Sequence, residues 1–486
     1  MKNKYQNKIL FFAFLFSFPR MQSPPNVEWL RFYGGSESDV ANSIIETNSG
    51  DFVILGTTYS FGSGHSDVYM VKVNKSGDTL WTKTFGGSSW DYGNRIIETS
   101  DYGYLIAGAT SSFGAPSWNM YIIRTDMNGD TLWTKTFQHT YDCTAQSIIE
   151  TMDGGFLAVG MESWSSPGGG GAQDYIVKMD SLGHLLWSDS FIGGIPGPLF
   201  TYSFGGANDI CETTSGDYLI FGAHDDSLTI LKVGADGDSL TTKVYPNGSA
   251  LSVTNTQDGH FAIGGFTIDP SNFNMKLLLM KVDENGDTIF TRTYEYGGNA
   301  RGNSIISLAD NGYAIYGASG NYPQYQSVLF RMDGDGNLLW SANFDISAND
   351  RGRGLIQTEN GNIMLAGYTI GDSTMSNGNM YLVALAQGLS IIDDTGILPN
   401  NILLSSNYPN PFNHSTIIPF SLINNSIIQI RIFNELGKIV YETRDLSYHS
   451  GNHQFFWDTK SLHSGVYFFQ LKSDQESKAI KCTLIK

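Results

Sequence analysis

The nonapeptide GDTLWTKTF fills residues 77–85, and the same nine residues recur at 129–137. Its tryptophan position has a counterpart at seven places along the chain, namely Trp29, Trp81, Trp133, Trp187, Thr241, Phe290 and Trp340. A period of about 50 residues is typical of propellers, solenoids and other repeat arrays. We therefore expect most of the chain to consist of one repeated supersecondary unit.

A glycine marks a second repeated position, inside short apolar stretches such as YLIAGAT at residues 104–110. It recurs as Gly56, Gly108, Gly160, Gly222, Gly265, Gly317 and Gly367. Each unit is predicted to form four short strands, which in the second unit cover residues 94–100, 104–110, 120–126 and 131–137. The dipeptide Asn128-Gly129 favours a tight hairpin between the last two, because both residues tolerate positive φ. Four-stranded units of this kind are typical of β-propeller blades.

The two ends of the repeat array are incomplete in complementary ways. The first tryptophan strand, residues 27–33, has no three strands before it, and the last three strands, near Gly354, Ile363 and Met380, have no tryptophan strand after them. We expect the strand around Trp29 to pair with the segment around Tyr381, so that no sheet edge stays open. The sequence thus predicts an all-β chain: a seven-bladed β-propeller over residues 24–388, a linker over 389–400 and a small β-sandwich over 401–486.

Composition and the N-terminal residues indicate where the chain acts. Lys and Arg total 29 against 47 Asp and Glu, and this net charge of -18 argues against nucleic acid as a partner. Lys2, Lys4 and Lys8 precede an apolar run of about ten residues, which is the pattern of a signal peptide and predicts one over residues 1–23. No other stretch of the sequence predicts a transmembrane segment. The three cysteines, Cys143, Cys211 and Cys482, suit neither a disulfide framework nor a paired metal site.

The last 86 residues carry several short motifs in a fixed order. NYPNPFN lies at residues 407–413, ELGK at 435–438, a Trp-Asp pair at 457–458 and SGVYF at 464–468. The motif residues that we single out are Asn407, Tyr408, Pro409, Asn410, Pro411, Phe412, Asn413, Gly437, Trp457, Asp458, Gly465 and Tyr467. The alternation of Ile428, Ile430 and Ile432 predicts a strand with one buried face, as a β-sandwich needs.

In this order, at the extreme C-terminus, these motifs resemble the type A sorting domain of the type IX secretion system. The resemblance implies export across the inner membrane by the signal peptide and then across the outer membrane by the sorting domain, with the secretion machinery as partner. It further implies that the domain is commonly removed, which leaves the protein released or attached to surface lipopolysaccharide. The expected location is therefore the outer-membrane cell surface or the medium.

Aromatic residues gather in two sets of loops that a propeller places on one face, those from second to third strand and from fourth to first. The ligand-binding candidates are Phe61, Trp90, Asp91, Tyr92, Phe113, Trp118, Trp164, Tyr202, Tyr322 and Tyr325. Flat apolar rings among short polar side chains suit the recognition of a polysaccharide or a peptide. The alternative is that the repeated Ser-Phe-Gly of residues 60–62 and 112–114 only staples its loop.

Residues that recur in most blades are expected to hold the blade, because a catalytic site needs one copy of each group in one place. Glu46, Glu98, Glu150 and Glu212 share one register and are read as hairpin anchors. Turns such as that of residues 126–130 are similar to calcium loops but lack the Glu at the twelfth position, so turn chemistry is favoured over calcium. No catalytic residue, metal site or other cofactor is assigned.

The sequence therefore favours an extracellular binding or adhesion protein over an enzyme. One alternative is an exported hydrolase or lyase that degrades polymers at a propeller active site. Another is a structural surface-layer component, which the near-identical first blades would suit.

Overall fold

The computed structural model describes residues 25–486 except for 115–116, 167–168, 192–205, 322–323, 345, 348, 371–377, 387–401, 405–406, 408–411, 423–425, 436, 444–445, 449–450, 460–461 and 474–476. The predicted signal peptide thus lies outside the described residues, as does most of the predicted linker. The chain divides into two compact units, on either side of residues 391 and 392. All the elements of the described residues are strands, and none of these residues forms a helix that could cross a membrane.

Within the described residues, the first unit contains seven four-stranded antiparallel sheets, which confirms the predicted blades. Blade 1 comprises β2 (Asp39–Glu46), β3 (Phe52–Thr58), β4 (Asp67–Val73) and β5 (Thr79–Phe85). Blade 2 comprises β6 (Asp91–Glu98), β7 (Tyr104–Thr110), β8 (Asn119–Thr125) and β9 (Thr131–Phe137). Blade 3 comprises β10 (Asp142–Glu150), β11 (Phe156–Ser166), β12 (Gly169–Met179) and β13 (Leu185–Phe191). Blade 4 comprises β14 (Gly206–Glu212), β15 (Tyr218–His224), β16 (Ser227–Val233) and β17 (Ser239–Tyr245).

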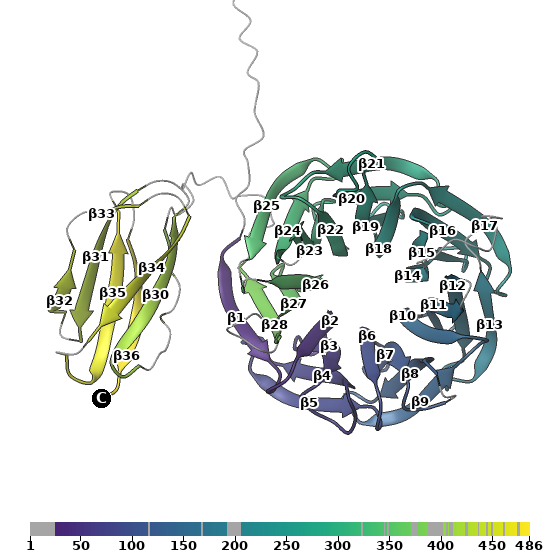
Figure 1. The fold of residues 1–486 in the computed structure, drawn as a ribbon, viewed down its shortest axis with the longest axis horizontal. Coiled ribbons are helices and arrows are strands. Elements are labelled where there is room, and N and C mark those ends of the chain that lie inside the picture. Colours follow the sequence, from purple (N-terminus) through teal and green to yellow (C-terminus); the bar gives the residue numbers. More distant parts are fainter. Residues whose placement is uncertain are drawn as a thin grey trace, which may run out of the picture. The chain divides into compact units, whose positions relative to one another are not determined.

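The remaining blades follow the same plan. Blade 5 comprises β18 (Gly248–Asn255), β19 (Phe261–Ile268), β20 (Met275–Val282) and β21 (Thr288–Tyr294). Blade 6 comprises β22 (Ala300–Ser307), β23 (Tyr313–Asn321), β24 (Gln324–Met332) and β25 (Leu338–Phe344). Blade 7 comprises β26 (Asp350–Gln357), β27 (Ile363–Thr369), β28 (Met380–Leu385) and β1 (Val27–Tyr33). In every blade the first of these strands lies nearest the axis of the ring and the last lies at its circumference (Figure 1).

The ring closes as predicted. β1 pairs antiparallel with β28, with Trp29 opposite Ala384 and Phe32 opposite Tyr381. Figure 1 shows the purple β1 alongside the green β28, so the two ends of the repeat array share one sheet. The edge of β28 is thereby paired, and an unpaired edge would otherwise offer its backbone groups to other chains.

The hydrophobic core of this unit lies between the blades. Among the described residues, seven clusters of buried side chains occupy the seven junctions, one cluster at each. The second and third strands, such as β3 and β4, are buried along their whole length, whereas the outer strand β5 alternates between exposed and partly buried residues. A sheet sandwiched between two neighbours buries both of its faces, which explains the apolar runs in the sequence.

The repeated glycine of the second strand is required by a close approach of two backbones. The innermost strand of blade 1 shifts its register between Ala41 and Ser43, and the carbonyl of Val40 then faces Gly56. A Cβ on Gly56 would lie 1.7 Å from the Val40 carbonyl oxygen, and one on Gly108 would lie 1.9 Å from that of Tyr92. Any larger residue would therefore have to break the bulge.

The nonapeptide recurs because its glycine and its tryptophan meet in neighbouring blades. Gly129 sits in the hairpin of blade 2 with φ of 76°, and a Cβ there would lie 2.9 Å from the ring of Trp81 in blade 1. Trp133 covers Gly183 of blade 3 in the same way. The repeated glutamates also join blades: Glu98 accepts a hydrogen bond from the backbone N–H of Asn48 at 2.8 Å, which supports the hairpin-anchor interpretation.

The second unit has two antiparallel sheets. One contains β29 (Ile402–Leu404), β30 (Ser415–Leu422) and β34 (Gly451–Asp458). The other contains β31 (Ser426–Asn434), β32 (Ile439–Glu442), β33 (Leu446–Tyr448), β35 (Gly465–Lys472) and β36 (Ser477–Leu484). Buried side chains from both sheets, such as Phe420 and Phe469, form a single cluster, as in the predicted sandwich.

Several sorting-motif residues build this second core. Phe412, Trp457 and Tyr467 are buried together, with the Trp457 ring 5.5 Å from each of the other two rings. The side chain of the buried Asn407 donates a hydrogen bond to Thr416 Oγ1 at 2.9 Å, and Gly437 turns the chain with φ of 74°. Asp458 is the last residue of β34, Gly465 is the first residue of β35, and Asn413 lies two residues before β30. Tyr408, Pro409, Asn410 and Pro411 lie outside the described residues.

Candidate ligand-binding face

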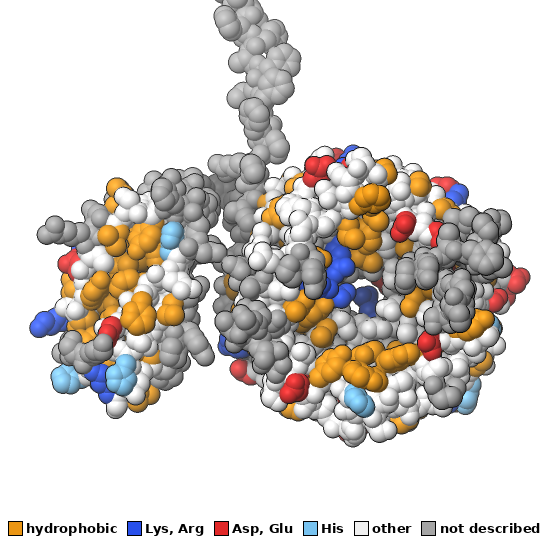
Figure 2. All heavy atoms as spheres, viewed as in Figure 1, with side chains coloured by type: hydrophobic (Ala, Val, Ile, Leu, Met, Phe, Trp, Pro, Cys, Tyr) orange, Lys and Arg blue, Asp and Glu red, His pale blue; other side chains and the backbone are white. Residues whose placement is uncertain are grey.

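The loops from second to third strand and from fourth to first strand open on one side of the ring, which we call the aromatic face. On the side in view, Figure 2 shows hydrophobic side chains gathered near the axis over blades 1 and 2. Phe61, Trp90, Phe113 and Trp118 belong to the loops of this face, whereas Asp91 and Tyr92, which the sequence placed in a loop, are the first two residues of β6. The side chain of Trp164 and the residues Tyr202 and Tyr322 lie outside the described part of the chain.

Five rings form a continuous group at the junction of blades 1 and 2, here called the aromatic cluster: Tyr59, His65, Trp90, Tyr92 and Trp118. His65 stacks on Trp90 with ring centroids 4.9 Å apart, and Tyr59 meets the same indole edge-on at 6.1 Å. Tyr92 stacks on Trp118 at 5.1 Å. Burial, followed by a hydrogen bond with Tyr59, raises the pKa of Tyr92 to about 12, so its hydroxyl stays neutral. The sequence analysis found three of these rings, while Tyr59 and His65 were overlooked although they flank Phe61 in one loop.

Backbone hydrogen bonds fix the loop that carries Trp90. The N–H of Trp90 donates to Ser111 Oγ at 3.1 Å, and the N–H of Ser111 donates to the Trp90 carbonyl at 2.8 Å. The Ser89 and Ser111 hydroxyls are 2.8 Å apart. Trp90 is nevertheless 37% exposed, so its indole is both held in place and accessible.

Asp91 has a structural task that the sequence analysis did not assign to it. Its carboxylate is fully buried and accepts hydrogen bonds from the Gly87 N–H at 2.9 Å and from Ser112 Oγ at 2.6 Å. Asp39 repeats both contacts in blade 1, with Gly35 and Ser60. The carboxylate of Asp91 therefore anchors two loops and is not exposed to a ligand.

Phe61 and Phe113 combine the two roles that the sequence left open. Each ring packs at a tilt against a tyrosine of its own blade, Phe61 on Tyr69 at 5.5 Å and Phe113 on Tyr121 at 5.8 Å. The preceding serines are held by the buried aspartates, so the Ser-Phe-Gly loop is stapled. Both phenyl rings still remain about two-fifths exposed, at 44% and 41%.

Tyr325 lies apart from the aromatic cluster, at the start of β24 in blade 6. The guanidinium of Arg351 lies over the Tyr325 ring in a cation–π contact, 4.6 Å from the ring centroid. The Tyr325 N–H donates to the side-chain carbonyl of Asn349 at 3.3 Å. The structure therefore divides the described candidates between two places on the ring, blades 1 and 2 on one hand and blade 6 on the other.

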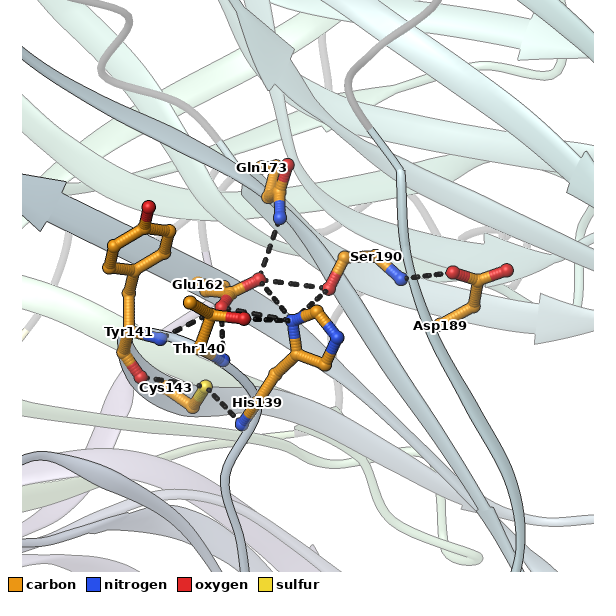
Figure 3. Close-up of polar contacts among 8 residues, drawn as sticks. All are labelled: His139, Thr140, Tyr141, Cys143, Glu162, Gln173, Asp189 and Ser190. Atoms are coloured by element: carbon orange, nitrogen blue, oxygen red, sulfur yellow. Dashed lines mark hydrogen bonds and ion pairs between the residues drawn. The ribbon is translucent and has the colours of Figure 1, made fainter. Parts of the chain in front are cut away.

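A polar network in blade 3 is the strongest catalytic candidate on this face (Figure 3). The Glu162 carboxylate, at the middle of β11, accepts hydrogen bonds from the N–H groups of Thr140 and Tyr141 at 2.7 and 2.9 Å. It also accepts from Gln173 Nε2 at 2.6 Å and from Ser190 Oγ at 2.9 Å. Burial alone would raise the pKa of Glu162, but these hydrogen bonds together lower it, so the group is ionised.

The geometry of this network does not support nucleophilic catalysis. Ser190 Oγ and the Glu162 carboxylate both approach Nδ1 of His139, at 3.5 and 3.1 Å. A catalytic triad needs the nucleophile and the acid on opposite ring nitrogens. Burial raises the pKa of the nearby Cys143 thiol to about 11, so it is no thiolate nucleophile. Glu162 therefore anchors loops of blade 3, as Asp91 does in blade 2.

The turns that are similar to calcium loops use their carboxylates internally. Asp126 Oδ1 accepts hydrogen bonds from the N–H groups of Asn128 and Asp130, each at 2.9 Å. Asp283 and Asp333 bind their own turns in the same way. Among the described residues, no three His, Cys, Asp or Glu side chains are grouped so that they could hold a metal ion.

Comparisons with solved structures return matches at low identity. PorZ, described as an essential bacterial surface component of the type-IX secretion system of Porphyromonas gingivalis, is 13% identical over 90% of this chain, with a TM-score of 0.41. The chain spans 58% of that protein's length. A fungal alcohol oxidase of the AA5 family is 9% identical, over 95% of this chain and 100% of that one, with a TM-score of 0.48. The propeller of Dos1 is 9% identical, over 75% and 96%, with a TM-score of 0.44.

These identities and TM-scores are too low to assign the activity of any of these proteins to this chain. No match to a curated protein was found. Residues 406–486, by contrast, match the family model described as a secretion system C-terminal sorting domain. The match covers the unit whose core contains Phe412, Trp457 and Tyr467. A sorting domain implies contact with the secretion machinery and transport out of the cell. The second unit is therefore the sorting domain of the type IX secretion system, and the chain is a β-propeller protein exported to the cell surface or to the medium.

Proposed function

We propose that this exported propeller is a binding protein that holds a polysaccharide or a peptide on its aromatic face. The observation that supports this function best is the aromatic cluster at the junction of blades 1 and 2. Tyr59 and His65 contact Trp90, Tyr92 stacks on Trp118, and a hydrogen bond between Tyr59 and Tyr92 joins the two groups. Tyr59 and Trp90 remain 39% and 37% exposed. The exposed faces of such rings offer stacking surface for the C–H faces of a sugar or for apolar peptide side chains.

The cluster is suited to binding because its loops are already ordered. The hydrogen bonds between Trp90 and Ser111 fix the indole before any ligand arrives. A rigid ring loses little conformational entropy on binding, so more of the contact energy appears as affinity. The serine hydroxyls next to Trp90 supply donors and acceptors for a polar ligand.

The test is an array of glycans and peptides probed with the full chain and with matched variants. Trp90→Ala and Trp118→Ala are expected to weaken binding to any hit by about tenfold or more, because aromatic hot-spot residues commonly contribute about 2 kcal/mol or more. Leu132→Ala is the control, since Leu132 is 59% exposed on the outer strand β9, away from this face. Unchanged binding in Trp90→Ala, Phe113→Ala and Trp118→Ala together would rule out the aromatic face.

The rival functions predict other outcomes of the same experiments. A surface-layer component is expected to bind no arrayed ligand and to sediment with outer-membrane fragments as a self-associated layer. An exported hydrolase or lyase is expected to convert a bound polymer to shorter products. Binding without turnover supports the proposal.

We also propose that residues 1–23 are a signal peptide and that the sorting domain is cleaved after export, in or near residues 389–400. The motivation is the charge and hydropathy pattern of the N-terminus together with the matched sorting domain. Mass spectrometry of the medium and of the outer membrane is expected to find a chain lighter than 53.4 kDa. An intact chain in the cytoplasm would contradict both cleavages. Attachment to lipopolysaccharide would appear as a heterogeneous heavier species in the membrane fraction.

A further inference from the structure

Three arginines meet on the inner wall of the ring, at blades 6 and 7. Arg301 of β22 and Arg351 of β26 occupy the same register in adjacent blades, two residues before the bulge position, and Arg353 occupies the bulge position itself. In Figure 2, Lys and Arg side chains gather in the middle of the ring on the face in view, the region where Figure 1 places β22 and β26. We call this group the arginine cluster.

The bulge position holds the blades together elsewhere in the ring. In blades 1, 2, 4 and 6 it is an asparagine whose Nδ2 donates to a carbonyl of the next blade, at 2.7 or 2.8 Å: Asn42 to Gly93, Asn94 to Ala145, Asn208 to Ala250 and Asn303 to Gly352. The matching acceptor for blade 7 would be the carbonyl of Ala41 in blade 1. Blades 3, 5 and 7 carry Gln146, Leu251 and Arg353 at this position instead. The guanidinium of Arg353 lies over Tyr368, so the inter-blade bond does not explain the arginine.

The guanidinium groups pack on tyrosines and lack counter-charges. Arg351 lies over the ring of Tyr325 at 4.6 Å, and Arg353 lies over Tyr368 at 5.7 Å. The Nε atoms of Arg351 and Arg353 are buried without a hydrogen-bond partner. No ion pair joins any of the three arginines to a carboxylate among the residues that the structure describes.

Basic residues of the repeat behave differently. Lys178 pairs with Asp153 at 2.7 Å, and Arg124 and Arg331 contact Asp101 and Asp310. A chain with a net charge of -18 thus pairs these blade cations with carboxylates, whereas the arginine cluster has no carboxylate partner among the described residues. Arg301, Arg351 and Arg353 are partly buried, and removing cations from water without a counter-charge is costly. This points to a ligand that supplies the missing negative charge.

Electrostatic effects agree with this placement. Burial, followed by the charges of Arg353 and Arg351, lowers the pKa of Arg301. Burial alone would raise the pKa of Tyr368, but the charges of Arg353 and Arg351 and their hydrogen bonds lower it. The inner wall therefore favours negative charge at this point of the ring.

We propose that the arginine cluster binds an oxyanion group, a carboxylate, sulfate or phosphate, of an extracellular ligand. The planar guanidinium fork matches the paired oxygens of such groups. Tyr325 orients the guanidinium of Arg351, and Tyr368 orients that of Arg353. The propeller places the three arginines around one region of its inner wall. The arginine cluster and the aromatic cluster share no residue. A failure of the oxyanion proposal would therefore leave the function proposed above untouched, and the reverse also holds.

The test is calorimetric titration of the full chain with sulfate, phosphate and glucuronate, each at constant ionic strength set with chloride. The variant is Arg353→Asn, which restores the residue type found in four other blades. It is expected to weaken oxyanion binding by at least about tenfold, the loss that one charge-assisted hydrogen bond gives. Without oxyanion it is expected to melt no lower than the parent chain, because it relieves repulsion and gains an acceptor at Ala41. Arg351→Thr, which copies Thr144 of blade 3, is the second variant.

The control is Arg431→Gln, which removes a paired surface arginine from the sorting domain and is expected to leave binding unchanged. The order of affinity among the three probes separates a sugar acid from an inorganic anion: preferred glucuronate indicates an acidic glycan, and preferred phosphate indicates a phosphorylated ligand. Equal heats for all probes and chloride, or binding that survives in both Arg353→Asn and Arg351→Thr, would overturn the proposal. So would a melting temperature lowered equally with and without oxyanion, since that indicates a purely structural arginine.

Discussion

Blades 1 and 2 and blades 6 and 7 share one backbone plan but present opposite chemistry near the axis of the ring. Two residues before the bulge position, blade 2 carries Tyr92, stacked on Trp118, whereas blades 6 and 7 carry Arg301 and Arg351. The scaffold around these positions is the same: a first strand with a bulge, a glycine opposite it and a buried second strand. Departures from the repeat, rather than the repeat itself, therefore mark the candidates for function.

The comparison depends on a division between repeat positions that stabilise the propeller and positions that vary from blade to blade. A substitution at a stabilising position is the strongest test of this division. Gly265 and Gly264 are adjacent in β19 and offer a matched pair. A Cβ on Gly265 would lie 2.0 Å from the Ser249 carbonyl oxygen, whereas one on Gly264 would meet the side chains of Ile305 and Ile315, at 3.1 Å and 3.8 Å.

Gly265→Ala is expected to be the most damaging of these substitutions, lowering the free energy of unfolding by about 3 kcal/mol or more, because backbone must move to admit the methyl group. Gly264→Ala is expected to change it by less than about 1 kcal/mol, since blade 2 has Ala107 at that place. Urea unfolding followed by tryptophan fluorescence measures both. Similar midpoints for the two variants would show that the repeated glycine has no structural task.

The asparagine bond between blades gives a smaller test. Asn303→Leu copies Leu251, the residue that blade 5 has at the bulge, and removes the bond to the Gly352 carbonyl. The expected loss is about 1 kcal/mol, the net contribution of one hydrogen bond. The converse variant, Leu251→Asn, is the control and is expected to gain stability. A loss in both variants would mean that each blade is adapted to its own residue, and the register comparison would then fail.

The sequence predicted the fold well because its signals are periodic and local. The tryptophan and glycine positions of the nonapeptide recur at a regular spacing along the sequence. The structure shows why, because Trp81 of blade 1 contacts Gly129 of blade 2 across a blade junction. The pairing of β1 with β28 followed from the incomplete ends of the array, which leave one way to complete seven sheets. The sorting domain was recognised from a motif order that survives in a short stretch of sequence.

The candidate site was harder to predict, because it depends on residues that meet only in space. Tyr59 and His65 complete the aromatic cluster, but nothing in their spacing links them to Trp90. Asp91 was placed among the ligand-binding candidates because it adjoins Trp90, yet its side chain is buried against Ser112. The arginine cluster was missed since Arg301 and Arg351 are distant in sequence, although an alignment of the seven innermost strands places them in one register.

A third part of the ring, between blades 3 and 4, provides the paired counterpart of the arginine cluster. His224 Nε2 and Asp174 Oδ1 are 2.9 Å apart, and both side chains are buried. Burial alone would lower the pKa of His224, but the hydrogen bond and charge of Asp174, with a smaller effect of Asp225, raise it. Here a buried histidine has a counter-charge for its protonated form within the chain, so no ligand is required.

This pair is expected to give the smallest effect, and one that depends on pH. A histidine whose pKa is higher in the folded chain stabilises it fully below the unfolded pKa of about 6.5, and this contribution is lost as pH rises through the folded pKa. The difference in unfolding free energy between the parent chain and His224→Gln is therefore expected to be largest near pH 5.5 and to shrink toward pH 8 or above. His184→Gln is the control, because its ion pair with Asp180 is exposed. A difference that stays constant across this range would mean that folding leaves the pKa of His224 unchanged, and one that grows with pH would mean that His224 is neutral in the folded chain. Either result would remove the paired member from the contrast between paired and unpaired cations on the ring.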